Sequence, residues 1–276
     1  MFEDTILNPA GPVSAATRDL LFDAVGLMLI VIVPVFILTA LIVWRYRAAN
    51  TDAKYTPDWE GSRVIEIGIW FMPLLIVVLL WALVWDRTHA LDPYKPLASA
   101  EPPLAVQAIA LDWQWLFVYP AENVASLNRL VFPAGRPLSI ELTSDTVMNS
   151  LSIPALGGQI YAMAGMRTRL NLMADAPGAF TGRNTKFSGN GFAGQSFSAE
   201  ATDAAGFDAF VAEARAAGAA LDAATYATVS QPTANGPAKL FAPVEQGLFD
   251  TIVAGYDSMP AAHGAPATSA HKGPTQ

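Results

Sequence analysis

The sequence predicts a membrane-anchored all-β protein, in which a two-helix transmembrane hairpin precedes a β-sandwich and a C-terminal helical segment. Two uncharged runs near the N-terminus are each about 20 apolar residues long, which is the length that crosses a hydrocarbon core. From residue 104 onward, apolar residues alternate with polar ones, as on a half-buried strand. An alanine-rich stretch at 203–229 then carries apolar residues at helical spacing.

Composition supports the membrane assignment and removes several chemistries. Of the 276 residues, 53% are hydrophobic and 14% are charged, whereas soluble domains are about a quarter charged. The net charge of −8 argues against a nucleic-acid partner. The chain has no cysteine, which excludes disulfides, thiolate catalysis and thiolate metal ligands. Its histidines, His89, His263 and His271, lie outside 104–201, which excludes a histidine metal site in the β-patterned region.

The two apolar runs, 24–44 and 64–85, are the predicted transmembrane helices. Each has a proline in mid-span, Pro34 and Pro73, which membrane helices tolerate where neighbours satisfy the freed carbonyl. Buried core helices are the alternative, but apolar runs of this length are rare in soluble proteins. Residues 1–23 are expected to form an exposed, outward-facing lead-in and lack the pattern of a signal peptide. Either the numbering starts at a processed end, or the first helix also serves as the targeting signal.

The loop between the two runs, 45–63, is the most basic segment near them. Its basic residues are Arg45, Arg47, Lys54 and Arg63. Only Arg18 precedes the first run, and Arg87 and Lys95 follow the second. The positive-inside rule therefore places this loop in the cytoplasm, with the N-terminus and the C-terminal part of the chain outside.

A proline-rich linker at 86–103 leads into the β-patterned region, 104–201. Runs of alternating or β-prone residues, separated by glycine and proline turns, indicate a β-sandwich there. The clearest runs are 112–119, 136–144 and 167–173. Late in the region, the stretch TKFSGNGFAGQSF at 185–197 predicts a tight, glycine-rich loop between strands. Loops in this position commonly hold a metal, yet this one contains no Cys, His or Met.

The C-terminal helical segment is predicted at 202–256. Asp203 is a candidate N-cap for its first helix. A second, short helix is expected between Pro243 and Tyr256. Residues 257–276 have the composition of a disordered tail.

Three side chains are candidates for a role beyond packing. Glu66 is the only ionisable residue in the second run and lies about one turn inside its cytoplasmic end. It either reaches the lipid headgroups or handles protons toward a partner subunit, and its position alone leaves both open. On a strand, Trp113 and Trp115 would share one face. The residues themselves favour core or subunit-interface packing over an aromatic contact on an electron path.

The longer polar and aromatic strings carry a resemblance to a known family. They include LDWQWLFVYP at 111–120, IPALGGQIYAMAGMRTRL at 153–170 and FSGNGFAGQSF at 187–197. Together with two membrane helices before an outward β-sandwich, they resemble subunit II of the haem-copper respiratory oxidases. Within that superfamily they resemble most closely the cytochrome bo-type ubiquinol oxidases. The resemblance covers residues 20–256 and leaves out the lead-in and the tail.

The resemblance implies a cupredoxin-like β domain that lacks its metal. In the cytochrome c oxidase branch, this domain holds a binuclear copper centre with ligands from an early strand and a late loop. The matching positions here are Asn149, Lys186, Asn190, Gly194 and Phe197. None of these side chains replaces the thiolate, imidazole or thioether that binds such copper. The resemblance therefore implies the quinol-oxidising branch, in which electrons enter through the catalytic subunit.

The same resemblance assigns roles to the three candidates. Glu66 matches the glutamate that the family places at the entrance of a proton channel into subunit I. Trp115 matches a tryptophan that passes electrons from copper to haem in the copper branch. Without a copper donor, we expect Trp113 and Trp115 to be subunit-interface residues instead. The lipid-anchored N-terminal cysteine of the family is absent from this chain.

We therefore predict a non-catalytic subunit II of a proton-pumping ubiquinol oxidase, in a bacterial inner membrane with the C-terminal domain in the periplasm. The chain itself would carry no cofactor. Haem and copper would belong to the partner subunit I, and ubiquinol would be the substrate of the complex. Its partners would be the other oxidase subunits and the lipid bilayer. The alternatives are a copper-carrying subunit II of cytochrome c oxidase and a membrane-tethered binding protein unrelated to respiration.

Overall fold

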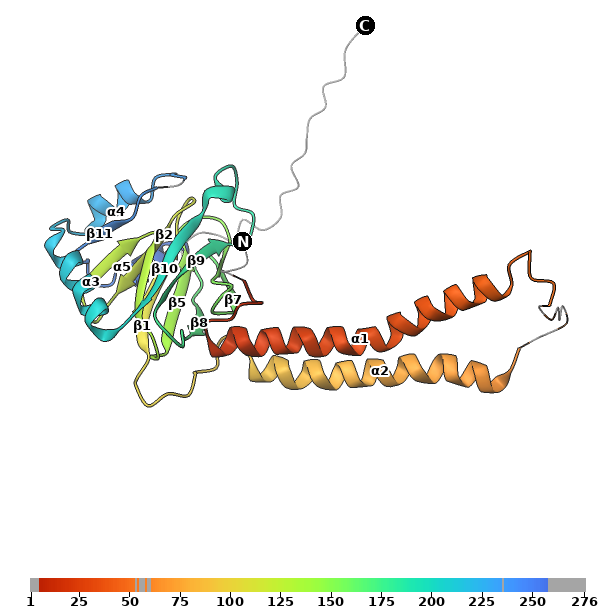
Figure 1. The fold of residues 1–276 in the computed structure, drawn as a ribbon. Helices are drawn as coiled ribbons and strands as arrows, with labels where there is room; N and C mark the ends of the chain where they lie inside the picture. The colour runs from red at the N-terminus through yellow and green to blue at the C-terminus, as the bar shows by residue number, and fades with distance from the viewer. Residues whose placement is uncertain (1–4, 53, 55–57, 59–60, 235, 258–276) are drawn as a thin grey trace, which may run out of the picture.

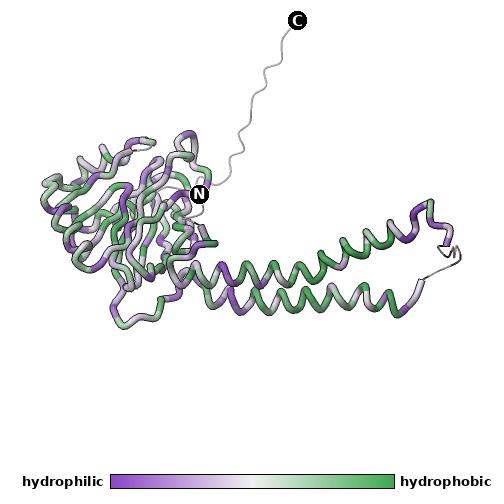
Figure 2. Tube along the Cα trace, in the orientation of Figure 1, coloured by the Kyte–Doolittle hydropathy of each residue, from purple (hydrophilic) through white to green (hydrophobic). Residues whose placement is uncertain are grey.

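A computed structural model describes residues 5–52, 54, 58, 61–234 and 236–257 of the chain. Two long helices lie side by side as a hairpin and project from one end of a β-sandwich (Figure 1). Helix α1 is Pro12–Arg45 and helix α2 is Arg63–Ala90. Figure 2 shows hydrophobic residues gathered along both helices, with polar residues toward their ends. Both helices are long and apolar enough to cross a membrane.

Helix α1 begins twelve residues before the predicted span, so the apolar run 24–44 forms only its later part. Pro12 is well placed at the start because the first turn needs no backbone N–H from it. The 34 residues of α1 give a length of about 50 Å, against a hydrocarbon core of about 30 Å. The first three turns therefore extend beyond the apolar run toward the β-sandwich.

The prediction that residues 1–23 form an exposed lead-in was wrong for the segment around Gly11. The Ala10 N–H donates to the Ala155 carbonyl at 2.8 Å, and the Asp175 N–H donates to the Ala10 carbonyl at 2.9 Å. The Ser14 N–H donates to the Leu156 carbonyl at 3.2 Å, and the Ser14 side chain is fully buried. Backbone groups at the start of a helix need outside partners, and here the β-sandwich supplies one of them.

Eleven strands form two sheets in the part of the chain that the structure describes. The six-stranded sheet has the order β11-β3-β2-β1-β5-β8, and the five-stranded sheet has the order β4-β10-β9-β6-β7. The strands of the first sheet are β1 (Leu104–Ala110), β2 (Trp115–Tyr119), β3 (Val124–Leu127), β5 (Leu138–Ser144), β8 (Thr168–Leu172) and β11 (Lys239–Phe241). Those of the second are β4 (Arg129–Pro133), β6 (Asn149–Ser152), β7 (Gln159–Ala162), β9 (Gly178–Asn184) and β10 (Ser196–Thr202).

The predicted strand runs correspond to β2, β5 and β8, and the β region ends one residue later than predicted, at Thr202. In β5 the alternation is that of a strand with one face in the core, where Leu138, Ile140 and Leu142 are buried. Strand β2 is buried along its whole length. It reads as an unbroken apolar run because both of its faces are covered.

The C-terminal helical segment contains α3 (Ala204–Ala216), α4 (Ala223–Val229) and α5 (Leu248–Asp257), with β11 between α4 and α5. Residues of α4 and α5 cover the second face of the six-stranded sheet, whereas α3 packs on the core between the two sheets. Asp203 caps α3 as predicted, accepting the Gly206 N–H at 2.7 Å. Phe249, Ile252 and Val253 of α5 pack in one cluster with Leu116 and Val118 of β2. The segment is therefore part of the same folded unit as the sandwich.

Three predicted segments end differently in the structure or fall partly outside it. Helix α2 continues to Ala90, so the linker begins at Leu91 instead of residue 86. The loop 45–63 is described only in part. Of the predicted tail 257–276, only Asp257 is described, and it is the last residue of α5.

Candidate functional site

The loop predicted at 185–197 joins β9 to β10, which are antiparallel neighbours in the five-stranded sheet. A short 3-10 turn at Phe192–Gly194 forms its second half. The indole of Trp113 lies against the loop and donates its Nε1–H to the Ser188 carbonyl at 3.0 Å. A Cβ atom at Gly191 would lie 2.2 Å from this indole. The glycine is therefore required by the close approach of Trp113.

Under the loop, the side chain of Asn184 is the centre of a buried amide network. Its Nδ2 donates to Asn149 Oδ1 at 2.6 Å and to Gln195 Oε1 at 2.8 Å. Its Oδ1 accepts the Ser150 N–H at 2.8 Å. Asn149, Asn184 and Gln195 each expose 4% of their surface or less. Buried polar side chains of this kind are stable when their groups are paired, and the Ser188 hydroxyl adds a further donor to Gln195 Oε1 at 2.9 Å.

This interior does not fit a copper ion. Copper in such sites is bound by thiolate, thioether and imidazole groups, whereas the groups here are amides and a hydroxyl. These groups are also already engaged with one another, so a metal would have to displace several hydrogen bonds. In the part of the chain that the structure describes, no three His, Cys, Asp or Glu side chains gather as a metal site.

The five predicted copper-equivalent positions differ in how deeply they are buried. Asn149 is buried in the amide network, and Phe197 is buried with its ring 4.9 Å from that of Phe117. Lys186 and Asn190 are exposed, and Gly194 is half-buried in the 3-10 turn. The residues that fill the interior, Asn184 and Gln195, were not predicted. The available signal was two amide side chains that flank the glycine-rich loop.

Glu66 lies far from this loop, at the opposite end of the hairpin from the β-sandwich (Figure 1). It is in the first turn of α2, where a negative charge interacts favourably with the helix dipole. Its side chain is exposed and lines a shallow groove along α2. The other residues of this groove are Arg63, Ile67, Trp70, Phe71 and Leu74.

Comparison with known proteins decides the family. The protein-family model named cytochrome c oxidase subunit II, periplasmic domain, matches residues 120–201. The family model named COX aromatic rich motif matches residues 215–258. Cytochrome bo(3) ubiquinol oxidase subunit 2 of Pseudomonas putida is 45% identical over 92% of this chain and 81% of that protein. That of Pseudomonas aeruginosa is 44% identical over 97% of this chain and 82% of its own length. Ubiquinol oxidase subunit 2 of Acetobacter aceti is 42% identical, with coverage of 92% and 83%.

This chain belongs to the family of cytochrome bo(3) ubiquinol oxidase subunit 2. The predicted resemblance is confirmed. The predicted fold class is also confirmed, since two apolar helices precede a β-sandwich of the cupredoxin-like type found in subunit II.

In this subunit II chain, the two tryptophans do not share the face of one strand as predicted. Trp113 has a φ of 66° and lies in the turn before β2, where it is half-buried over the 185–197 loop. Trp115 begins β2 and has 0% of its surface exposed. The expectation of a subunit contact by the Trp115 side chain was therefore wrong, because its ring packs in the sandwich core, 6.0 Å from that of Phe197. An interface role for Trp113 stays a prediction.

The aromatic-rich part of the subunit II chain is attached to the sandwich through Asp145. The Tyr226 hydroxyl donates to Asp145 Oδ2 at 2.5 Å, and the Tyr256 hydroxyl donates to Asp145 Oδ1 at 3.2 Å. Burial, followed by the Asp145 carboxylate, raises the pKa of Tyr226 well above its usual range. The same two causes raise the pKa of Tyr256 to about 12. Both phenols therefore stay protonated, and can donate to Asp145, up to a more alkaline pH than an exposed tyrosine does.

Proposed function

We propose that this chain is the non-catalytic subunit II of a proton-pumping ubiquinol oxidase, which oxidises ubiquinol and reduces oxygen to water. The haems and copper of that reaction belong to subunit I in this proposal. The observation that carries it is the interior beneath the 185–197 loop. Paired amides of Asn149, Asn184 and Gln195 fill this interior, which by the resemblance corresponds to the copper region of the cytochrome c oxidase branch.

The proposed location is a bacterial inner membrane, with α1 and α2 crossing it and the β-sandwich on the periplasmic side. The apolar surfaces of both helices and the basic loop 45–63 support this orientation. The helix hairpin would pack against subunit I, and the β-sandwich would cover its outer surface.

Metal and haem analysis of the purified complex tests the proposal. We expect haem to co-purify with the chain in mild detergent, and we expect copper only in the amount that subunit I binds. Stoichiometric copper in this subunit would favour the cytochrome c oxidase alternative. A chain that purifies without haem would instead favour the membrane-tethered binding protein.

We further propose that Glu66 supplies a proton-entry carboxylate to subunit I. Side chains of α2 that are buried or half-buried, such as Ile76 and Leu83, turn toward α1. At 100° per residue, Glu66 lies about 80° around the helix from Ile76, and its groove neighbours Trp70 and Leu74 lie about 120° and 160° from Ile76. The groove therefore faces away from α1, and Glu66 lies at the edge of the groove that is nearest to α1. A carboxylate inside a membrane is costly next to lipid, so an outer face that carries one is expected to meet protein or water.

Substitution of Glu66 in the assembled oxidase tests this role. We expect Glu66→Gln to lower turnover and proton pumping by roughly an order of magnitude or more, because a positioned proton-transfer group contributes at least that much. Glu66→Asp keeps a carboxylate and should keep much of the activity. Glu101→Gln, in the exposed linker, is the matched control. Unchanged turnover and pumping in Glu66→Gln would refute the proposal.

A further inference from the structure

The exposed large hydrophobic side chains of the β-sandwich gather in one region. In the described residues between 104 and 257, five side chains of this kind are exposed. They are Val147 and Met148 between β5 and β6, Tyr161 of β7, Met166 in the turn after β7, and Phe187 in the 185–197 loop. We call these five residues the β6 patch. Hydrophobic residues that are exposed singly are ordinary, whereas a group of them marks an interaction site.

Antiparallel pairing brings the β6 patch to one end of the sandwich. Strand β6 pairs on one side with β7, where Asn149 lies opposite Ala162, and on the other side with β9, where Leu151 lies opposite Asn184. Antiparallel neighbours run in opposite directions, so the start of β6 lies beside the ends of β7 and β9. Each residue of the β6 patch is within four residues of one of these three strand ends.

Phe187 is the most exposed residue of the β6 patch, at 72%, and it is presented on a fixed base. Its ring lies 5.6 Å from that of Phe192 in the 3-10 turn. The next residue, Ser188, accepts the Trp113 indole N–H at its carbonyl and donates its hydroxyl to Gln195 Oε1. The buried amide network therefore holds the loop that carries Phe187. An aromatic side chain held in this way loses little conformational entropy on binding, which suits an interface anchor.

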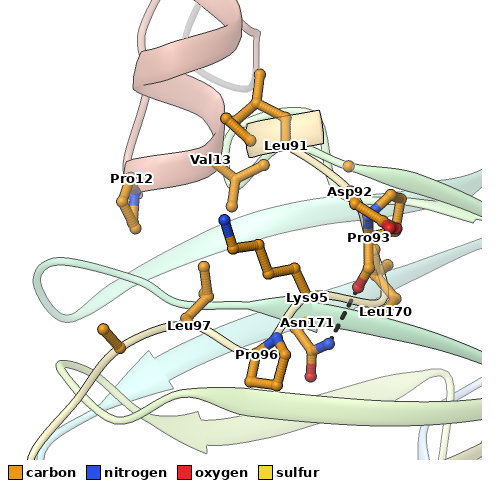
Figure 3. Close-up of a pocket in the computed structure, with 13 residues that line it drawn as sticks. Pro12, Val13, Leu91, Asp92, Pro93, Lys95, Pro96, Leu97, Leu170 and Asn171 are labelled. Carbon is orange, nitrogen blue, oxygen red and sulfur yellow. Dashed lines mark hydrogen bonds between the residues drawn. The ribbon is translucent and has the colours of Figure 1, made fainter. Parts of the chain in front are cut away.

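The β6 patch is on the side of the sandwich from which the hairpin projects. In Figure 1, β7 and the loop between β9 and β10 lie at the end of the sandwich nearest the hairpin. The hairpin is attached there through the backbone bonds of Ala10 and Ser14. It is attached again through Asn171, whose N–H and Nδ2 donate to the Pro93 carbonyl at 3.1 and 3.0 Å, beside a cavity of about 290 Å³ (Figure 3). With α1 and α2 in a membrane, the β6 patch therefore faces the membrane surface.

The height of the sandwich above the membrane favours a membrane protein as the partner. The apolar run of α1 begins at Ala24, and Pro12, where α1 meets the sandwich, is about 18 Å further along the helix axis. Lipid headgroups extend only about 5–8 Å beyond the hydrocarbon core, so they fall short of the sandwich. The remaining gap of about 10 Å is too narrow for a soluble domain. A second copy in the same membrane would also turn its patch toward the membrane, so two patches could not face each other.

We propose that the β6 patch docks on the outer surface of subunit I, with Phe187 as the main contact. This inference rests on the proposed function, which places the sandwich over subunit I, and it assigns the docking surface and its anchor residue. The part of subunit I that meets Phe187 would be apolar and would rise above the membrane beside the hairpin. The 185–197 loop, with paired amides beneath it, would serve as the rigid support of this contact.

Photo-crosslinking in intact membranes tests the contact. Replacement of Phe187 by p-benzoylphenylalanine keeps a large aromatic side chain, and we expect it to form a covalent adduct with subunit I on illumination. The same replacement of Ala209 is the matched control, because Ala209 is exposed on α3, on the side of the sandwich away from the hairpin (Figure 1). It should give no adduct with subunit I. At position 187, an adduct with phospholipid, with a second copy of the chain or with a soluble protein would overturn the proposal, as would the absence of any adduct.

Phe187→Asp measures how much the contact contributes. The side chain is largely exposed in the chain by itself, so the substitution should leave the fold intact. We expect the Phe187→Asp chain to dissociate from the detergent-solubilised complex roughly 10- to 30-fold faster than wild type, the effect of losing one interface anchor. Ala209→Asp should dissociate at the wild-type rate, and a wild-type rate in Phe187→Asp would overturn the proposal.

Failure of this inference is distinguishable from failure of the proposed function. A chain that purifies without haem would defeat the proposed function itself. Haem that co-purifies with a chain whose position 187 forms no adduct with subunit I would defeat only the docking surface.

Discussion

The junction between α1 and the β-sandwich can be tested with a single methyl group at Gly157. This residue has a φ of +85°, and a Cβ atom there would lie 2.6 Å from the Ser14 nitrogen and 2.9 Å from the Ser14 Cα. Both are backbone atoms, so no side-chain rotation relieves the overlap. Gly157→Ala should therefore push the start of α1 away from the sandwich.

The expected cost of Gly157→Ala has two parts. An alanine in the left-handed region costs about 1–2 kcal/mol. Displacement of Ser14 also breaks its N–H bond to Leu156 and its hydroxyl bond to Pro154, each 3.2 Å long. These two bonds contribute about 0.5–1.5 kcal/mol each. The local free energy of opening should therefore fall by about 2–5 kcal/mol in total, of which about 1–3 kcal/mol comes from the lost bonds.

Gly247→Ala is the matched control, because Gly247 has a φ of +75° and no atom within 4 Å of an added Cβ. It has the backbone strain without the overlap. Hydrogen exchange of the Ser14 amide, followed by mass spectrometry in the intact complex, measures the local opening. We expect Ser14 exchange to be wild-type-like in Gly247→Ala and roughly 30- to 5,000-fold faster in Gly157→Ala, which corresponds to the 2–5 kcal/mol of strain and lost bonds. Equal Ser14 exchange in the two variants would refute the reasoning.

Other predictions concern the amide network and two titrating contacts. Asn184→Ala leaves two buried polar groups unpaired and should lower the free energy of unfolding by about 2–5 kcal/mol; a thermal midpoint equal to wild type would contradict this. Burial and Asp145 raise the pKa of Tyr256 to about 12 in the folded chain, whereas an unfolded chain has the ordinary tyrosine pKa of about 10. The unfolded state therefore loses this proton at a lower pH, and the free energy of unfolding should fall as the pH rises from about 10 to 12. Tyr256→Phe should flatten that fall in a pH series of melting curves. Hydrogen bonds from Arg129 lower the pKa of Glu200, so the stability that this pair contributes is present above the usual carboxyl pKa and is lost as the pH falls below it. Arg129→Gln should therefore make the melting temperature less sensitive to acid pH. A melting temperature that falls with acid as steeply as in wild type would contradict this.

The membrane helices could be predicted from the sequence because a run of uncharged apolar residues is a local signal. The start of α1 could not. The residues from Pro12 to Asp23 include charged side chains and have no apolar run, and their helix docks on the β-sandwich through contacts with Ala155 and Leu156. Strand β11 was missed for a related reason. Three residues are too few to show a period, and β11 is defined by its pairing with β3.

The composition of the region beneath the 185–197 loop could be predicted, whereas its internal arrangement could not. The absence of Cys, and of His between residues 104 and 201, is a property of residue types and needs no coordinates. The hydrogen bonds of Asn184 join strands β6 and β9 with the loop, over sequence separations of 35 and 11 residues. The positive φ of Trp113 likewise separates two tryptophans that an unbroken strand would have placed together.

By itself, the sequence determined the class of this protein: two membrane helices, a β-sandwich and a loop without metal ligands in a subunit II of the bo(3) type. These features follow from hydrophobic length, alternation and residue chemistry, which are local properties of the chain. Only the tertiary structure decided that amides fill the interior beneath the 185–197 loop, and that Trp115 is buried while Trp113 covers the loop. Each of these depends on segments far apart in sequence meeting in the fold, and burial and pairing of polar groups are set only by that meeting.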